Sequence, residues 1–255
     1  MQGIRRDQIK DLLNSAGFVN VQELVTRFNV SSETIRRDLE YLERDGVVRR
    51  IHGGAVSVLP HVNESSYTAR QQYHTTEKCA IARAAASLIQ DGDTILIAPG
   101  TTTRLVSSFL RKHTGITAVT NSLPVAMELS GCPGVDVHCL GGHLRSDDYS
   151  TSGITALENL NIFNISKLIM GVGGITPGGI TDYRMDESAL LRTFINKADC
   201  VIGLADHAKF GIVCVYNICP VDHLDYLITD SGTPEEYLQP YREKGVTVRI
   251  ADADE

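Results

Sequence analysis

Features typical of secreted and membrane proteins are missing from this sequence. No apolar run reaches the length of about eighteen residues that a helix needs to cross a bilayer, and the opening stretch MQGIRRDQIK lacks the apolar core of a signal peptide. The cysteines form no CxxC pair and no compact disulfide framework. We therefore expect a cytoplasmic protein that makes no membrane contact, keeps its cysteines reduced, and holds no metal and no cofactor.

The chain also lacks a net positive charge, and its formal net charge of -7 argues against a nucleic-acid binder when it is taken as a whole. The charge is unevenly distributed, however. Residues 1–60 contain nine Lys and Arg against eight Asp and Glu, which leaves 15 against 23 for the remainder. The acidity therefore belongs to the C-terminal part, and the two parts differ in electrostatic character.

The N-terminal part is predicted to form three short helices followed by a hairpin. Helical spacing of apolar residues places the helices over 4–17, 21–28 and 31–45. Asn29 suits a tight turn, Ser31 can cap the third helix, and Gly46 can end it. Residues 47–59 read as two strands joined at a pair of glycines, an arrangement typical of a β-wing.

The third helix has the layout of a DNA recognition helix. Its apolar residues form one stripe, which leaves Arg37 on the opposite face with Arg36 on its flank. A guanidinium can reach both acceptors of a guanine, and helix-start hydroxyls and N–H groups suit phosphate oxygens. The alternative is an ordinary solvated face in which Glu33 pairs with Arg37. The candidate DNA-binding residues are Ser31, Ser32, Thr34, Arg36, Arg37, Arg49, Arg50 and His52.

The C-terminal part alternates predicted strands with predicted helices. The strands are expected over 94–98, 116–120, 135–140, 167–172, 200–205, 226–230 and 246–251. The helices are expected over 77–89, 102–112, 123–130, 186–198 and 234–245. Such alternation predicts an α/β domain with a mainly parallel sheet flanked by helices. We therefore expect a winged helix-turn-helix domain over 1–58, a polar linker without apolar period over 59–76, and an α/β effector-sensing domain over 77–255.

Short polar loops follow several of these strands, at the edge where open α/β sheets bind ligands. The stretch APGTTT offers glycine, hydroxyls and a helix start, which suit a phosphate. TNS, LGG and GVGGIT follow further strands, and ADHAKFG adds a lysine that can pair with an anion. Each loop also has a plain structural explanation: the glycines could serve turns only, Asp206 could cap a helix, and Lys209 could be a surface charge.

These motifs resemble a known family. Residues 4–57, which include VQELVTRFNVSSETIRRDLEYLERDGVVRRIHGGA, are similar to the winged helix-turn-helix of the DeoR family of bacterial transcription regulators. Residues of about 75–250 resemble the sensor domain of that family, which is similar in fold to ribose-5-phosphate isomerases; the shared features are GTTT, GVGGIT, the DES helix start and ADHAK. The resemblance implies that Thr101–Thr103 and Lys209 hold the phosphate of a phosphorylated sugar.

This chain departs from the isomerase pattern at positions that serve catalysis, while the expected binding residues are kept. The isomerases carry a DGAD loop and a lysine before a run of glycines, whereas this chain has GVGG and TPGGITD at those places. Glu187 falls near the catalytic glutamate of the isomerases and could act as a base, but a developing enediolate would find little stabilisation. We therefore expect no catalytic residue. The candidate effector-binding residues are Gly100, Thr101, Thr102, Thr103, Asn121, Gly141, Gly142, Gly173, Glu187, Asp206 and Lys209.

The sequence thus predicts a transcriptional regulator, most simply a repressor of a carbohydrate-utilisation operon, whose effector is a phosphorylated sugar or polyol. Its partners would be a double-stranded DNA operator and further copies of itself in a homodimer or homotetramer. One alternative is an active sugar-phosphate isomerase or deaminase that carries a DNA-binding module. Another is a structural DNA-binding protein whose larger domain only oligomerises.

Overall fold

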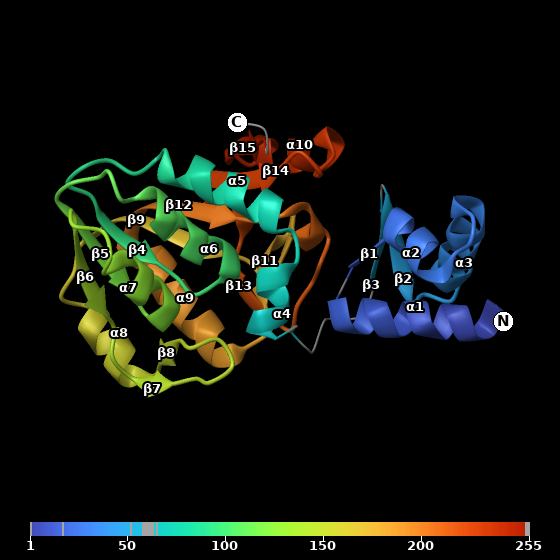
Figure 1. Ribbon diagram of the computed structural model, residues 1–255, viewed down its shortest axis with the longest axis horizontal. Coiled ribbons are helices and arrows are strands. Elements are labelled where there is room, and N and C mark those ends of the chain that lie inside the picture. Colours follow the sequence, from blue (N-terminus) through green and yellow to red (C-terminus); the bar gives the residue numbers. More distant parts are fainter. Residues whose placement is uncertain (1, 17, 52, 58–63, 65, 253–255) are drawn as a thin grey trace.

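The computed structural model describes residues 2–16, 18–51, 53–57, 64 and 66–252 of the chain. Figure 1 shows a small N-terminal domain beside a larger α/β domain. Within the described residues, no helix combines the length and the apolar character required to span a membrane.

The N-terminal domain packs helices against a small antiparallel sheet. Its elements are α1 (Gln2–Ala16), β1 (Phe18–Asn20), α2 (Val21–Phe28), α3 (Ser32–Arg44), β2 (Val48–Ile51) and β3 (Gly54–Ser57). The strand order is β1-β3-β2. The helices and the hairpin predicted from the sequence are therefore confirmed, and β1 is an additional strand that pairs with β3.

The local signals work as the sequence indicates. The Asn20 side chain accepts the Gln22 N–H at 2.7 Å at the start of α2, and Asn29 ends that helix with a left-handed φ of 49°. Ser31 caps α3 by accepting the Thr34 N–H at 3.2 Å. The predicted apolar stripe of α3 is buried, since Ile35, Leu39 and Leu42 are at most 1% exposed.

The larger domain contains most of the chain's regular structure. Its helices are α4 (Tyr67–Gln72), α5 (Thr75–Ala86), α6 (Thr101–Val106), α7 (Leu123–Leu129), α8 (Ile154–Leu160), α9 (Met185–Lys197) and α10 (Glu235–Glu243), with 3-10 turns η1 (Ser107–Phe109), η2 (His207–Lys209) and η3 (Val221–His223). Its strands are β4 (Thr94–Ile97), β5 (Ile116–Thr120), β6 (Val135–Cys139), β7 (His143–Leu144), β8 (Thr151–Ser152), β9 (Ile165–Gly171), β10 (Gly174–Thr176), β11 (Gly179–Asp182), β12 (Ala198–Leu204), β13 (Tyr216–Cys219), β14 (Tyr226–Asp230) and β15 (Thr247–Ala251).

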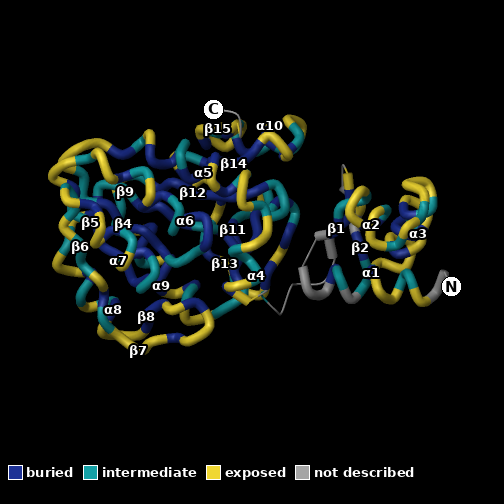
Figure 2. Tube along the Cα trace, in the orientation of Figure 1, coloured by how far each residue is buried: buried dark blue, intermediate teal, exposed yellow. Residues whose placement is uncertain are grey.

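A seven-stranded sheet in the order β15-β14-β12-β9-β4-β5-β6 forms the centre of this domain. Every neighbouring pair of strands in it is parallel, and its members are the strands expected from the sequence. Side chains of α5, α6 and α7 pack on one face of the sheet, and those of α8, α9 and α10 on the other. Figure 2 shows the central strands of the sheet as a buried layer and the helices exposed on their outer sides. The predicted α/β fold with a parallel sheet flanked by helices is confirmed.

Two of the segments described from the sequence differ in the structure. The stretch expected to be a linker contains α4, which begins at a Ser66 cap that accepts the Ala69 N–H at 3.2 Å. Tyr67, at 5% exposure, anchors this helix and packs edge-on against Tyr149, with ring centroids 6.3 Å apart. A single aromatic anchor gives no apolar period, so the pattern could not reveal the helix. The helix expected over 102–112 ends instead at Val106 and continues as the short turn η1.

Candidate functional sites

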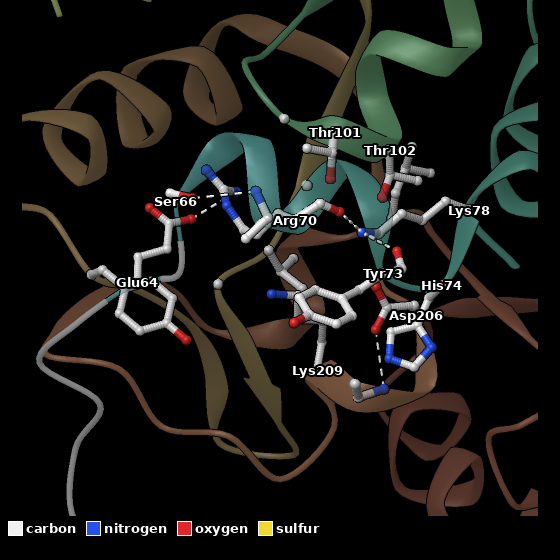
Figure 3. A pocket seen from close by; sticks show the side chains of 18 of the residues that line it. Glu64, Ser66, Arg70, Tyr73, His74, Lys78, Thr101, Thr102, Asp206 and Lys209 are labelled. Atoms are coloured by element: carbon white, nitrogen blue, oxygen red, sulfur yellow. Dashed lines mark hydrogen bonds and ion pairs between the residues drawn. The ribbon is translucent and has the colours of Figure 1, made fainter. Parts of the chain in front are cut away.

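A cavity lies at the carboxyl edge of the parallel sheet, where the loops after β4, β9 and β12 meet α4 and the start of α5. Its volume is about 1100 Å³, and it also borders residues of α1, β1 and α2. Figure 3 shows side chains of α4, the start of α5, the loop after β4 and the turn after β12 converging on it. The carboxyl edge is where the strand order of open α/β sheets leaves room for a ligand.

The loop after β4 brings hydroxyls to the cavity. Gly100, Thr101 and Thr102 line it, while Thr103 is fully buried and its hydroxyl donates to the Gly100 carbonyl at 3.1 Å. A Cβ at Gly100 would lie 2.8 Å from the Thr103 Oγ1, so the loop requires glycine there. Of the four predicted residues, three face the cavity and Thr103 supports the loop from behind.

The turn after β12 contributes a second predicted pair. Asp206 and Lys209 both line the cavity. Asp206 is 3% exposed and caps η2 by accepting the Ala208 N–H at 3.1 Å, so the capping role considered from the sequence is met as well. Lys209, at the end of η2, adds a cation to the same wall. Gly173, from the loop after β9, lines the cavity too.

Lys78 of α5 is a cavity residue that the sequence reasoning missed. It is 5% exposed, and its ammonium donates to the Arg70 carbonyl at 2.5 Å and to the Tyr73 carbonyl at 2.8 Å. Burial lowers its pKa from 10.5 to about 8, against the opposing attraction of Asp206. A signal was present: Lys78 precedes Ile81, Ala82 and Ala85 at helical spacing, so it is a charge on the apolar face of its helix.

Carboxylates occupy another part of the wall. Asp182, at the end of β11, and Glu187 of α9 line the cavity with Glu64. Burial, and then the charge of Glu64, raises the pKa of Asp182 to about 6. Burial and the charge of Asp182 raise the pKa of Glu187, while Arg145 opposes that increase.

Arg145 fixes the carboxylate that the isomerase likeness singled out. Its guanidinium donates to Glu187 at 2.9 Å and to Asp148 at 2.5 Å, and Arg145 itself is 6% exposed. Glu187 is thus the partner of a buried arginine. Among the residues that the structure describes, no group of His, Cys, Asp and Glu side chains is arranged to hold a metal ion.

Two histidines join the segment between α4 and α5 to the turn after β12. His74 has a left-handed φ of 53°, and its ring meets that of His207 edge-on with centroids 4.6 Å apart. His207 Nδ1 lies 2.8 Å from Asp230 Oδ2. The hydrogen bond with Asp230 raises the pKa of His207, although burial opposes the charged ring.

The remaining predicted effector residues do not line this cavity. The Asn121 amide donates to the Thr151 carbonyl at 2.8 Å, which ties the end of β5 to β8. The Gly141 N–H donates to Asn159 Oδ1 at 3.1 Å. A Cβ at Gly142 would lie 2.4 Å from the Ser152 carbonyl oxygen. These residues therefore serve the packing of the loop after β6 rather than the cavity.

The candidate nucleic-acid interface is the exposed side of α3. Ser31, Ser32, Arg36 and Arg37 are exposed there, and Thr34 is half-buried. The Arg37 Nε donates to Glu33 at 3.1 Å, but the Arg37 side chain is still 74% exposed. The ion pair considered from the sequence is therefore present, and the guanidinium stays accessible to solvent. Because surface pairs of this kind are weak, Glu33 does not hold Arg37 away from another partner.

The wing is tied to α3. The Arg50 N–H donates to Glu43 at 2.9 Å, and its guanidinium pairs with Glu40 at 2.8 Å. Arg49 belongs to β2, and the structure describes its backbone but not its side chain. His52 lies outside the described residues.

An ion-pair cluster that the sequence reasoning did not anticipate joins α1 to the buried side of α3. Asp38 is 1% exposed, and it accepts from Arg5 Nε at 2.6 Å and from Arg6 Nε at 2.8 Å. The Arg6 guanidinium also lies 3.9 Å from the ring centroid of Tyr41. These contacts fix the helix that presents Arg36 and Arg37.

Known proteins match both parts of the chain. Residues 5–60 match the DeoR-like helix-turn-helix domain, and residues 73–231 match the DeoR C terminal sensor domain. The HTH-type transcriptional repressor GlcR of Bacillus subtilis (strain 168) is 32% identical over 247 residues, which cover 97% of this chain and 95% of that protein. The glycerol-3-phosphate regulon repressor of Escherichia coli (strain K12) is 34% identical over 236 residues, which cover 92% of this chain and 93% of that protein. Among solved structures, ribose 5 phosphate isomerase A from Neisseria gonorrhoeae aligns with 15% identity and a TM-score of 0.38 over 53% of each chain.

Proposed function

Because this chain belongs to the DeoR family of bacterial transcription regulators and is a DNA-binding regulator rather than an enzyme, we propose that it represses a carbohydrate-utilisation operon under the control of a phosphorylated sugar or polyol. The names of its relatives, a glycerol-3-phosphate regulon repressor among them, support this class of effector. We further propose that it works in the cytoplasm as a homodimer or homotetramer, with a winged helix over 1–58 joined through 59–76 to a sensor over 77–255.

The observation that carries the effector proposal is the convergence of unlike groups on one cavity. Lys78 and Lys209 supply cations, Thr101 and Thr102 supply hydroxyls, and a phosphate is bound well by such a set. The carboxylates Asp182 and Glu187 on another wall can accept hydrogen bonds from the hydroxyls of a sugar or polyol. The cavity therefore combines groups that suit an anion with groups that suit a polyhydroxyl chain.

The DNA proposal rests on α3 and the wing. The exposed Arg36 and Arg37 are to contact bases and phosphates, with Ser31, Ser32 and Thr34 at the helix start. Arg50 holds the wing against α3 in the structure, and Arg49 and His52 remain proposed contacts of the wing. Sensors joined across a two-fold axis would set two such helices on a palindromic operator. An effector that favours another arrangement of the sensors would then lower operator affinity.

A thermal-shift screen tests the effector class. The full-length protein is heated with a panel of phosphorylated sugars and polyols, the matched free compounds, and inorganic phosphate. We expect the melting temperature to rise with one phosphorylated compound and not with its free form, because a ligand that binds only the native state stabilises it.

The test variant is Lys209→Ala, which removes a cation of the cavity. The matched control is Lys244→Ala, which removes an exposed lysine at the C-terminal end of α10. Lys209→Ala should lose the shift and Lys244→Ala should keep it. A shift of equal size from the free sugar, or a Lys209→Ala variant that responds like the wild type, would show that the cavity does not select phosphate.

A further inference from the structure

Lys78 lies where the effector cavity meets α4. Its ammonium donates to the carbonyls of Arg70 and Tyr73, which belong to the last turn of α4 and to its C-cap. Figure 3 shows the side chain reaching these carbonyls from the side of the cavity that holds Thr102 and Asp206. Carbonyl groups at a helix C-terminus carry partial negative charge and lack partners within the helix, so the ammonium stabilises the end of α4.

This arrangement leaves the buried charge of Lys78 with only neutral partners at hydrogen-bond distance. In the described part of the chain, its Nζ forms no ion pair with a carboxylate within 4.0 Å. Bonds between ionised partners are stronger than bonds to neutral carbonyls. A phosphate bound beside Thr101, Thr102 and Lys209 therefore offers the ammonium a better acceptor than the end of α4 does.

The segment that Lys78 holds is the sensor's first contact with the rest of the chain. Residues 58–66 separate the end of β3 in the winged helix from α4. Near its start, α4 is held by the Ser66 cap and by Arg70, whose guanidinium pairs with Glu64 at 2.7 Å. A change in the position of α4 would therefore first displace the connection to the DNA-binding domain.

The segment after α4 is held by a second anchor at the cavity. His74, which has the strained left-handed backbone, packs its ring against His207 of η2. The same short turn carries Lys209, so a phosphate at Lys209 would act on both anchors at once. Strained residues of this kind persist only while their surroundings hold them.

We propose that Lys78 couples effector binding to the winged helix: it holds the end of α4, and a phosphate in the cavity takes over its ammonium and releases α4. This inference rests on the proposed phosphorylated effector and adds the residue through which that effector acts. A ligand can shift an equilibrium between two states only if it interacts differently with them. Here Lys78 bonds to α4 in one state and to the ligand in the other.

Hydrogen exchange measured by mass spectrometry tests the coupling, with inorganic phosphate as the probe and the full-length protein as the sample. In the wild type, phosphate should speed exchange of the peptide that covers α4 by about tenfold, while the peptide that covers α8 stays unchanged. Lys78→Met should show fast α4 exchange without phosphate and no further change with it. Lys244→Met, at an exposed position, should behave like the wild type.

A parallel thermal-shift titration separates the two proposals. If phosphate stabilises the wild type while α4 exchange stays unchanged or slows, the coupling is wrong and the phosphate site stands. If Lys78→Met keeps the wild-type response of α4, the coupling is also wrong. If phosphate neither stabilises the wild type nor alters α4, the coupling through Lys78 is wrong, and the effector proposal fails as well when no phosphorylated sugar or polyol of the panel stabilises the wild type. Should circular dichroism show that Lys78→Met does not fold, Lys78→Gln, which keeps an N–H donor group and loses the charge, takes its place.

Discussion

We expect individual residues of α3 to determine which operator sequence the protein prefers. Arg37 keeps most of its side chain exposed despite the pair with Glu33, and Arg36 is exposed beside it. Arg37 can leave Glu33 for a guanine edge or a phosphate at little cost in free energy, because an exposed i,i+4 pair contributes only about 0.3–0.5 kcal/mol.

Arg37→Ala should weaken operator binding by about 1–3 kcal/mol and broaden the accepted sequences. Fluorescence anisotropy with duplexes selected from a random pool measures both effects. Arg111→Ala, an exposed position in the larger domain, serves as the matched control and should leave binding unchanged. Unaltered affinity and selectivity in Arg37→Ala would assign recognition to other residues.

The buried lysine of the cavity predicts a pH dependence. The pKa of Lys78 is lowered to about 8 by burial, so its ammonium is charged at neutral pH and loses its proton as the pH rises through that value. The affinity for a phosphate monoester should therefore fall between about pH 7 and about pH 9, because the monoester, with a second pKa near 6, keeps its charge over that range.

Isothermal titration with a simple phosphate monoester across that range measures the fall. Lys78→Arg keeps a permanent charge and should flatten the profile. A wild-type profile that is already flat would mean that Lys78 does not contact the phosphate.

At the scale of elements, α1 and α3 form one unit because of Asp38. Its carboxylate is almost fully buried and accepts from two arginines of α1, so its removal leaves those guanidinium groups without their partner. Breaking a buried pair in this way destabilises by about 3–5 kcal/mol.

Asp38→Ala should therefore loosen the winged helix while the sensor keeps its stability. Hydrogen exchange should rise in peptides of α1 and α3 and stay unchanged in those of β9 and β12. Asp7→Ala changes an exposed carboxylate of the same α1, one that lies 3.8 Å from Lys10 Nζ, and should have little effect. Equal exchange in the Asp38→Ala and wild-type proteins would show that apolar packing alone holds α1 to α3.

The sequence reveals the elements of this fold whose signals are local. The strands of the main sheet read directly as apolar runs because both of their faces are covered, and the caps Ser31 and Asn29 mark the limits of α3 and α2. The short strands β10, β11 and β13 are not evident from the sequence, because β10 and β11 form a tight hairpin of three and four residues and β13 pairs with β11 from a distant segment. Helix α4 was missed because its stability comes from Tyr67 and from the Lys78 ammonium.

The candidate cavity was predictable to the extent that it depends on strand ends. Thr101, Thr102 and Lys209 follow sheet strands directly, so the rule for open α/β sheets places them together. Asn121 follows a strand too, yet its amide donates to the Thr151 carbonyl instead of lining the cavity. The spacing of residues in the sequence cannot predict this orientation of the side chain. Asp182 comes from a strand outside the main sheet, so no strand-end rule could point to it.

At the scale of the whole molecule, the uneven charge separates two tasks. The first sixty residues are close to neutral, whereas the rest holds 15 Lys and Arg against 23 Asp and Glu. Like charges keep the sensor away from the phosphate backbone of DNA, so the approach of the winged helix is favoured electrostatically over that of the sensor. The excess of negative charge in the sensor thus supports the proposal that the winged helix contacts DNA.

The order of the sheet strands has a consequence for the growing polypeptide on the ribosome. The central strand β4 pairs with β9, so that Leu96 lies opposite Leu168, and the sheet cannot close before that later strand has been made. The winged helix buries a cluster drawn from residues 9–55 alone, and domains fold as units from the N-terminal end during synthesis. A nascent chain therefore completes its winged helix well before its α/β domain, and a product that ends prematurely after the first domain would lack the sensor through which we propose that two winged helices are joined.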